Sequence, residues 1–165
     1  LGREMYELAI TTLALAGLEH YEISNFALPG RRSRHNINYW NRGEYLGLGC
    51  SAASFLGGTR SSNEDKIAPY ISAVESGRRP IAEAETPVGL EALGEEAFLG
   101  LRLLEGFVPS QKIMDAFTGS WAILKARGLV REDAARWRLT REGVFLANDV
   151  FQEFVPPFSR QEATT

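Results

Sequence analysis

The sequence of 165 residues is 44% hydrophobic and 24% charged, a balance typical of a packed globular protein and not of a disordered chain. Its formal net charge of -3 gives no general attraction to phosphate or anionic lipid, so nucleic-acid binding would need a local basic patch. The single cysteine, Cys50, excludes an intrachain disulfide and cannot by itself build a zinc site or an iron–sulfur cluster. A lone cysteine in an apolar stretch is usually buried and inert, so Cys50 is assigned no role.

The first expected helix spans residues 3–18, where apolar residues recur at helical spacing until Gly17. Its most apolar run, residues 8–18, is about half of the ~20 residues that a membrane span needs and lacks a signal-peptide pattern. We therefore expect a cytoplasmic protein without a membrane anchor. The chain begins without an initiator methionine and already in a helical pattern, so we expect a fragment of a longer protein.

Residues 20–26, "HYEISNF", alternate as a strand does, with an apolar face and a polar face. A strand whose polar face turns inward is what the wall of a ligand-holding α/β barrel requires. Glu22, Ser24 and Asn25 lie on or beside this polar face and are candidate pocket-lining residues. The alternative is that they only close the bottom of the barrel by hydrogen bonding.

A short turn or helix is expected at residues 36–40, followed by "EYLGLGCSAASFLGG", residues 44–58. The first half of that segment reads as a buried strand whose glycines let a ligand approach the backbone closely. The next pattern, within residues 61–80, predicts a helix capped by Ser62 or Asn63. Residues 80–85 are expected to be a linker.

A second unit is expected to begin at Thr86 and Pro87, a cap residue followed by a proline that opens a helix. The buried stripe of that helix consists of Leu90, Leu93, Ala97, Phe98, Leu101 and Leu104. Two short helices at residues 111–117 and 121–126 follow, then a hairpin of "LVRE" and "RWRLT" and a last helix carrying Leu146, Val150 and Phe154. The order suggests a winged-helix-like module, with a fraying tail after Val155.

The hairpin region is rich in arginine, which raises nucleic-acid binding as one possible function. Residues 121–141 contain two acidic residues, Glu132 and Asp133, and six basic ones: Lys125, Arg127, Arg131, Arg136, Arg138 and Arg141. The helix that would enter a DNA groove offers few side chains able to read bases, so this alternative ranks lower. A third interpretation gives the module only a partner-docking or lid role.

The segment "SRHNINYW" places His35, one of two histidines in the chain, beside two asparagines, a tyrosine and a tryptophan. A turn has no use for an imidazole and two large aromatic rings, whereas a site for a flat, partly apolar ligand can use all three. If the segment is helical, His35 and Tyr39 share one face. The alternative is a structural loop histidine beside core aromatics.

Taken in order, four segments resemble the carboxy-terminal half of the oxygen-independent coproporphyrinogen III oxidase-like family of radical SAM proteins, and most closely its heme-chaperone branch. They are "YEISNFALPGRRSRHNINYWNRGEYLGLGCSAASF", "YISAVESGRRP", "EEAFLGLRLLEGF" and "LTREGVFLANDV". The resemblance covers roughly residues 7–154. It implies an α/β plus α+β architecture: the last elements of a partial (β/α) barrel at 1–60, a connecting helix and linker at 61–85, a winged-helix-like domain at 86–155, and a tail at 156–165.

In that family a CxxxCxxC motif in the barrel holds a [4Fe–4S] cluster that binds and cleaves S-adenosylmethionine. This chain has no such motif, so we expect neither a cluster nor radical chemistry from it alone. Whether it acts as an enzyme therefore stays open. The cluster would belong to another part of a full-length parent.

The HNxxYW motif, which the heme-chaperone branch is proposed to use for heme, is matched by His35, Asn36, Tyr39 and Trp40. The resemblance thus implies heme as a ligand, with His35 at the iron, and an acceptor hemoprotein as partner. The nearest alternative is the oxidase itself, which lacks this motif.

The segment "YLGLGCSAAS" resembles the family's segment near S-adenosylmethionine, which implies contacts from Leu46, Gly47 and Gly49. A tight turn without a ligand is the alternative. Many members of the family have a larger or more polar residue near Ala53, so the sequence departs from the family's pattern at this position.

Overall fold

The structure is a computed structural model that describes residues 1–157, and it divides into two compact units. Unit 1 contains residues 1–41 and the chain from Gly89 onward, and unit 2 contains residues 42–88. The tail expected from residue 156 lies almost entirely outside the described residues. The assignment of residues 1–60, 61–85 and 86–155 to barrel, connector and carboxy-terminal domain stays a prediction about the parent protein.

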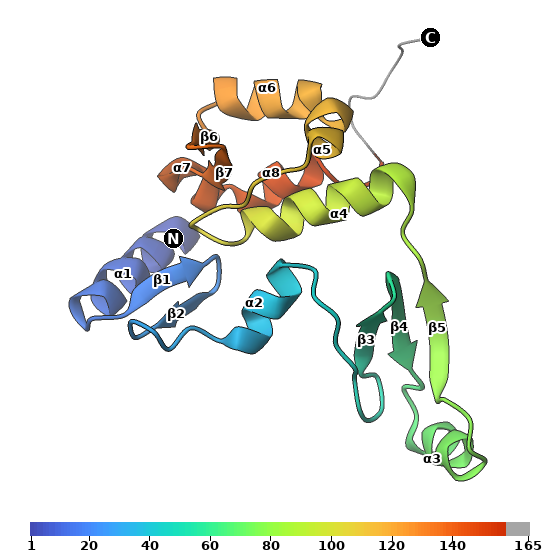
Figure 1. Ribbon diagram of the computed structural model, residues 1–165. Coiled ribbons are helices and arrows are strands. Elements are labelled where there is room, and N and C mark those ends of the chain that lie inside the picture. Colours follow the sequence, from blue (N-terminus) through green and yellow to red (C-terminus); the bar gives the residue numbers. More distant parts are fainter. Residues whose placement is uncertain (158–165) are drawn as a thin grey trace. The chain divides into compact units, whose positions relative to one another are not determined.

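The first part of unit 1 consists of helix α1 (Gly2–Leu15), strands β1 (Glu19–Glu22) and β2 (Asn25–Ala27), and helix α2 (Arg34–Trp40) (Figure 1). The expectation of one strand over residues 20–26 is wrong, because the chain reverses at Ile23 and Ser24 to pair β1 with β2 antiparallel. The carboxylate of Glu22 explains the reversal. It accepts hydrogen bonds from the backbone N–H of Ser24 at 3.1 Å and from the side-chain amide of Asn25, which closes the turn.

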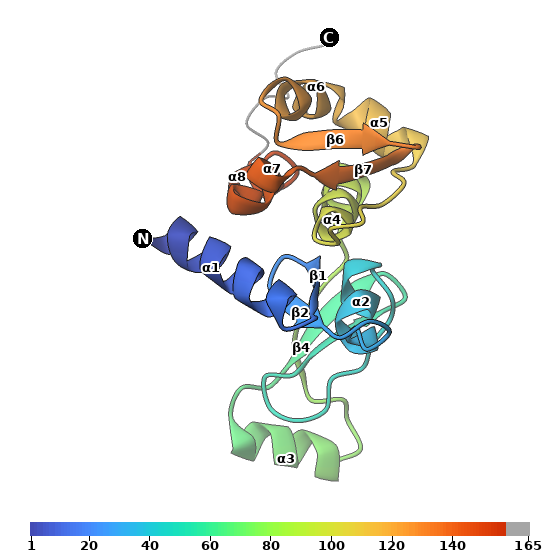
Figure 2. The same cartoon turned by 90° about the vertical axis from the view of Figure 1, so that its left-hand side faces the viewer.

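The second part of unit 1 is mainly helical, with one hairpin. It contains α4 (Gly89–Leu101), α5 (Gln111–Ala116), α6 (Thr118–Ala126), β6 (Val130–Asp133), β7 (Arg136–Leu139), α7 (Arg141–Phe145) and α8 (Ala147–Gln152). The predicted hairpin is confirmed, and Figure 2 shows it with α6 on one side and α4 on the other. The single last helix is instead two short helices, divided at Leu146, where φ is -110°.

The core of unit 1 lies between α4, α5, α6, the hairpin and α8. Trp121 stands at its centre, with its ring 4.8 Å from that of Trp137 and 4.7 Å from that of Phe154. The predicted stripe of α4 is confirmed up to the helix end, since Ala97 and Leu101 are fully buried. Leu90, Leu93 and Phe98 pack partly buried against the same core, whereas Leu104 lies beyond the helix.

Unit 2 is a three-stranded antiparallel sheet in the order β3 (Ala53–Leu56), β4 (Thr59–Asn63), β5 (Ile81–Glu85), with helix α3 (Ile67–Glu75) between β4 and β5 along the chain. The linker expected at residues 80–85 is therefore wrong, because this segment is the edge strand β5. The helix cap is also corrected. Lys66 precedes α3, while Ser62 and Asn63 belong to β4.

The buried strand expected at the start of residues 44–58 does not form. Only Tyr45 bridges to Phe55 there, through a reciprocal pair of backbone hydrogen bonds of 2.9 Å. Leu46 and Leu48 are exposed. The apolar residues that suggested a strand are thus on the surface of unit 2.

No helix within residues 1–157 is both long enough and apolar enough to cross a membrane.

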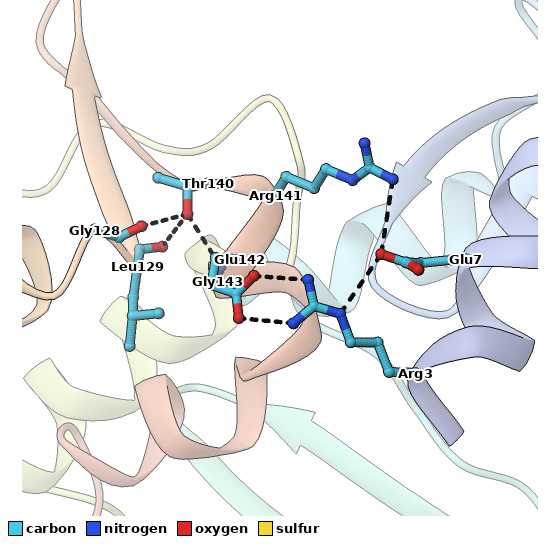
Figure 3. Close-up of polar contacts among 8 residues, drawn as sticks. All are labelled: Arg3, Glu7, Gly128, Leu129, Thr140, Arg141, Glu142 and Gly143. Carbon is cyan, nitrogen blue, oxygen red and sulfur yellow. Dashed lines mark hydrogen bonds and ion pairs between the residues drawn. The ribbon is translucent and has the colours of Figure 1, made fainter. Parts of the chain in front are cut away.

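Helix α7 approaches the backbone at Leu129 closely, and Thr140 organises the contact (Figure 3). The Thr140 hydroxyl accepts from the N–H of Gly143 at 3.0 Å and donates to the carbonyl of Gly128 at 2.6 Å. A Cβ atom on Gly143 would collide with the carbonyl oxygen of Leu129. Gly119, in α6, has no atom within 4 Å of the corresponding position.

These two helical glycines form a matched pair for a stability test. Gly143→Ala should destabilise unit 1 by about 1–3 kcal/mol, since α7 must shift to admit a methyl group. Gly119→Ala should be neutral or stabilising by up to about 1 kcal/mol, because alanine favours a helix and space is open. Urea unfolding followed by circular dichroism measures both. Equal effects would contradict the close approach of α7 to Leu129.

Candidate functional site

Helix α2 carries the histidine–aromatic cluster, and its first turn is set by Ser33. The Ser33 hydroxyl accepts from the N–H of Asn36 at 3.2 Å, as an N-cap residue does. Helical spacing then brings His35 and Tyr39 together, with ring centroids 4.5 Å apart at an interplanar angle of 69°. Trp40 follows, with its ring 6.4 Å from that of Tyr39.

His35 is the exposed member of this cluster. It forms no hydrogen bond or ion pair with any residue from 1 to 157, and its ring contact is with Tyr39. An imidazole in this state has lone-pair capacity available for a ligand.

Trp40 also contacts Arg102, which directly follows the end of α4. The guanidinium carbon of Arg102 lies 4.2 Å from the centroid of the Trp40 ring, a cation–π contact. The indole N–H of Trp40 is buried and has no hydrogen-bond partner within the described chain. Such an unpartnered buried donor is uncommon in a protein interior.

Glu22 is completely buried and links the β1–β2 hairpin to Arg102. One carboxylate oxygen closes the turn to Ser24 and Asn25, and the other lies 3.8 Å from the Arg102 guanidinium. Two of the expected pocket-lining residues, Glu22 and Asn25, are therefore joined through Arg102 to Trp40. Ser24 contributes its backbone N–H, and its side chain is exposed.

Arg102 is the residue that sequence reasoning missed. The available signal was a cation directly after the apolar stripe of α4, in "AFLGLRLL". Backbone hydrogen bonds fix its position: the N–H of Ile23 donates to the Arg102 carbonyl at 3.1 Å, and the N–H of Leu104 donates to the Tyr21 carbonyl at 3.1 Å.

The segment containing Leu46, Gly47 and Gly49 belongs to unit 2, and its backbone groups have partners there. The N–H of Gly47 donates to the Ser54 hydroxyl at 3.0 Å, and that of Gly49 donates to the Tyr70 hydroxyl at 3.1 Å. The carbonyls of both glycines accept from the Asn63 side-chain amide, at 3.3 and 2.9 Å.

The second histidine, His20 in β1, differs from His35. Its ring stacks on Phe26 at 4.2 Å and meets the edge of Tyr6 at 5.8 Å, while Nε2 lies 3.2 Å from the Ile23 carbonyl. Burial lowers the pKa of His20 below its ordinary value of 6.5, and the hydrogen bond to Ile23 only partly opposes this. Burial therefore favours the neutral form of His20, whose ring is part of the packing between Phe26 and Tyr6.

Metal-binding clusters of three or more His, Cys, Asp or Glu side chains are absent from residues 1–157. Cys50 is a free, partly exposed thiol.

The chain is similar to individual proteins of known family, although no protein-family model matches its sequence. The heme chaperone HemW of Bacillus subtilis is 33% identical over 160 residues, which are 92% of this chain and 42% of that protein. The heme chaperone HemW of Lactococcus lactis is 36% identical over 160 residues, 92% of this chain and 41% of that protein. The chain thus spans about two fifths of the length of these relatives.

The fold is similar to that of a solved radical SAM enzyme, coproporphyrinogen III oxidase (HemN) from Escherichia coli. The TM-score is 0.71 at 17% sequence identity, over 92% of this chain and 40% of that one. The chain therefore shares the mixed α/β fold of the matched part of this enzyme. Its curated relatives place it in the radical SAM, coproporphyrinogen III oxidase-like class. Within this class the chain belongs with the HemW proteins and corresponds to their carboxy-terminal portion.

The link between Glu22 and Arg102 can be tested by a double-mutant cycle. Arg102→Met leaves the buried Glu22 carboxylate without a counter-charge, which should cost about 3–5 kcal/mol. Combining it with Glu22→Gln removes that charge, so the double variant should be more stable than Arg102→Met alone, with a coupling above about 1 kcal/mol. Urea unfolding measures all variants, with Arg127→Met, at the exposed C-cap of α6, as the control. Simple additivity would argue against the pair.

His20 should make folding stability depend on pH. Its folded pKa lies below the 6.5 expected of the unfolded chain, so the unfolded state takes up the proton first as pH falls. The stability contribution of neutral His20 is therefore present above pH 6.5 and is lost as pH decreases toward the folded pKa. His20→Phe should lose less stability than the wild type between pH 7.5 and pH 5 in the same unfolding assay. Parallel profiles would show that His20 is not the group responsible.

Proposed function

We propose that this chain is the carboxy-terminal portion of a cytoplasmic radical SAM heme chaperone, which binds heme at helix α2 and passes it to an acceptor hemoprotein. The observation that carries the proposal is the imidazole of His35, unpaired within residues 1–157 and one helical turn from Tyr39, whose ring lies 6.4 Å from that of Trp40. A neutral imidazole ligates heme iron, and aromatic rings cover a porphyrin face. The HNxxYW pattern is complete in His35, Asn36, Tyr39 and Trp40.

Two features of α2 support heme as its ligand. His35 has no hydrogen-bond or ion-pair partner within the described residues that it would have to exchange before ligating iron, and Tyr39 presents an aromatic ring beside it. The Arg102 guanidinium, whose charge is balanced by the buried Glu22, stabilises the Trp40 ring beside the site through a cation–π contact. In this proposal Glu22 and Asn25 support the site through Arg102 and do not touch heme.

The parent protein would also contain a [4Fe–4S] cluster and S-adenosylmethionine. Cys50 alone does not fit the cluster, which needs several thiolates, so the ligands would come from another part of the parent. Leu46, Gly47 and Gly49 remain proposed contacts of S-adenosylmethionine. Because the N–H groups of both glycines are already donating and the Gly49 carbonyl accepts from both Asn63 and Ala52, such contacts would use the second lone pair of the Gly47 carbonyl or the exposed Leu46 side chain.

Two alternatives are less well supported. Coproporphyrinogen III oxidase shares the fold, but at 17% identity that likeness carries no activity across. Nucleic-acid binding would use the arginine-rich hairpin, where Arg138 pairs with Asp133, and Lys125 lies 3.8 Å from Glu132. These ion pairs leave less positive charge for a phosphate backbone than the sequence suggests.

Heme titration followed at the Soret band tests the proposal. His35→Ala should weaken heme binding at least about tenfold and alter the Soret band, because the iron loses an axial ligand. The fold should be unchanged, since His35 is exposed and contributes little packing. Arg34→Ala, one residue earlier on the same helix and also exposed, is the matched control and should bind heme as the wild type does.

Transfer is measured by mixing heme-loaded protein with apomyoglobin and following its Soret band. Unchanged affinity and spectrum in His35→Ala would assign the histidine a structural role and overturn the proposed site.

A further inference from the structure

Unit 1 contains a groove of about 660 Å³ on a different set of residues from those of α2. It lies between the last turns of α1, β1, and the junction of β7 with α7. Its wall is largely apolar: Ile10, Ala14, Leu104, Leu139, Val144 and Phe145. The volume falls within the range of roughly 300–1,000 Å³ that is typical of small-molecule sites.

The framework of this groove is tied together by ion pairs and ring contacts. Arg3 and Glu142 form a two-pronged pair with both N–O distances at 2.8 Å, which joins α1 to α7 (Figure 3). The ring of Phe145 meets the edge of Tyr6 at 5.6 Å. His20, which also lines the groove, has its ring fixed by stacking on Phe26.

Cations lie along one side of the groove. Arg131, Arg138 and Arg141 contribute to its lining, and none of its lining residues is an aspartate or a glutamate. Arg131 forms no ion pair with any residue of the described chain. The Arg141 side chain forms an ion pair with Glu7 at 3.8 Å and is 81% exposed, so it remains accessible to a ligand (Figure 3). Arg138 is already paired with Asp133.

An apolar wall beside the Arg131 guanidinium, unpaired in the described chain, and the exposed guanidinium of Arg141 selects one class of ligand. Apolar surface is covered favourably by a hydrocarbon body, and the planar guanidinium matches a carboxylate. A nucleic-acid backbone would leave the wall formed by Ile10, Ala14 and Phe145 without apolar contacts, and Asp133 and Glu132 of the hairpin would repel it.

We propose that this groove binds an apolar molecule carrying a carboxylate, with its body against α1 and Phe145 and its carboxylate at Arg131 and Arg141. A long-chain fatty acid and a porphyrin with propionate groups share this chemistry. None of the α2 residues lines the groove, so the site is independent of the proposed heme site.

Calorimetric titration with oleate and with iron-free protoporphyrin IX tests the groove and separates the two sources. At least one of them should bind, and its methyl ester should bind at least about tenfold more weakly, because the charge-assisted hydrogen bonds are lost. The double variant Arg131→Ala/Arg141→Ala should show the same loss for the free acid. Arg127→Ala, an exposed arginine outside the groove, should bind as the wild type does.

A second variant tests the apolar wall without changing charge. Ala14→Phe, at an exposed position of α1, should fill the groove and reduce binding at least about tenfold while circular dichroism stays unchanged. His35→Ala should leave this binding intact. The proposal is overturned if neither acid binds, if binding survives both the arginine and the Ala14 variants, or if His35→Ala abolishes it. Displacement of the acid by a DNA duplex, with the same arginine dependence, would also overturn it in favour of a nucleic-acid surface.

Discussion

The attachment of the β1–β2 hairpin to the end of α4 is the constraint on which the rest of unit 1 depends. Helix α4 is fixed by its buried stripe in the core around Trp121, and directly after its last turn the chain accepts from Ile23 and donates to Tyr21. The side chain of Arg102 adds its contacts with Glu22 and Trp40 at the same point. The hydrophobic core thus fixes the position of α2 indirectly, through α4 and Arg102, although α2 itself contains no buried residue.

In this arrangement the residues that stabilise the fold, such as His20, are distinct from the proposed ligand-binding residue His35. His20 packs between Phe26 and Tyr6, whereas His35 is exposed on α2, whose residue Trp40 contacts Arg102. A binding residue on a short exposed helix can change its contacts at little cost in core packing. Rigidity for the site comes instead from the buried carboxylate of Glu22, which reaches Trp40 through the guanidinium of Arg102.

The features predicted correctly from the sequence are those whose cause is local. The stripe of α4, the short helix ending at Trp40 and the β6–β7 hairpin each follow from spacing within one segment. The reversal after Glu22 was missed because a side-chain carboxylate closes it, and β5 was missed because its five residues are all exposed and are held by pairing with β4. Arg102 could not be assigned to the site from sequence, since its contact with Trp40 joins distant parts of the chain.

Unit 1 is assembled from two stretches of chain, with the whole of unit 2 between them. The buried core around Trp121 comes entirely from the second stretch, but the β1–β2 hairpin can attach to the end of α4 only after the intervening stretch has closed a loop. Loop closure carries an entropic cost that grows with the length of free chain. The β3–β4 hairpin of unit 2 depends on neighbours along the sequence and forms without such closure. We therefore expect folding to be sequential, with the intervening sheet condensing first and shortening the effective loop that the larger unit must close.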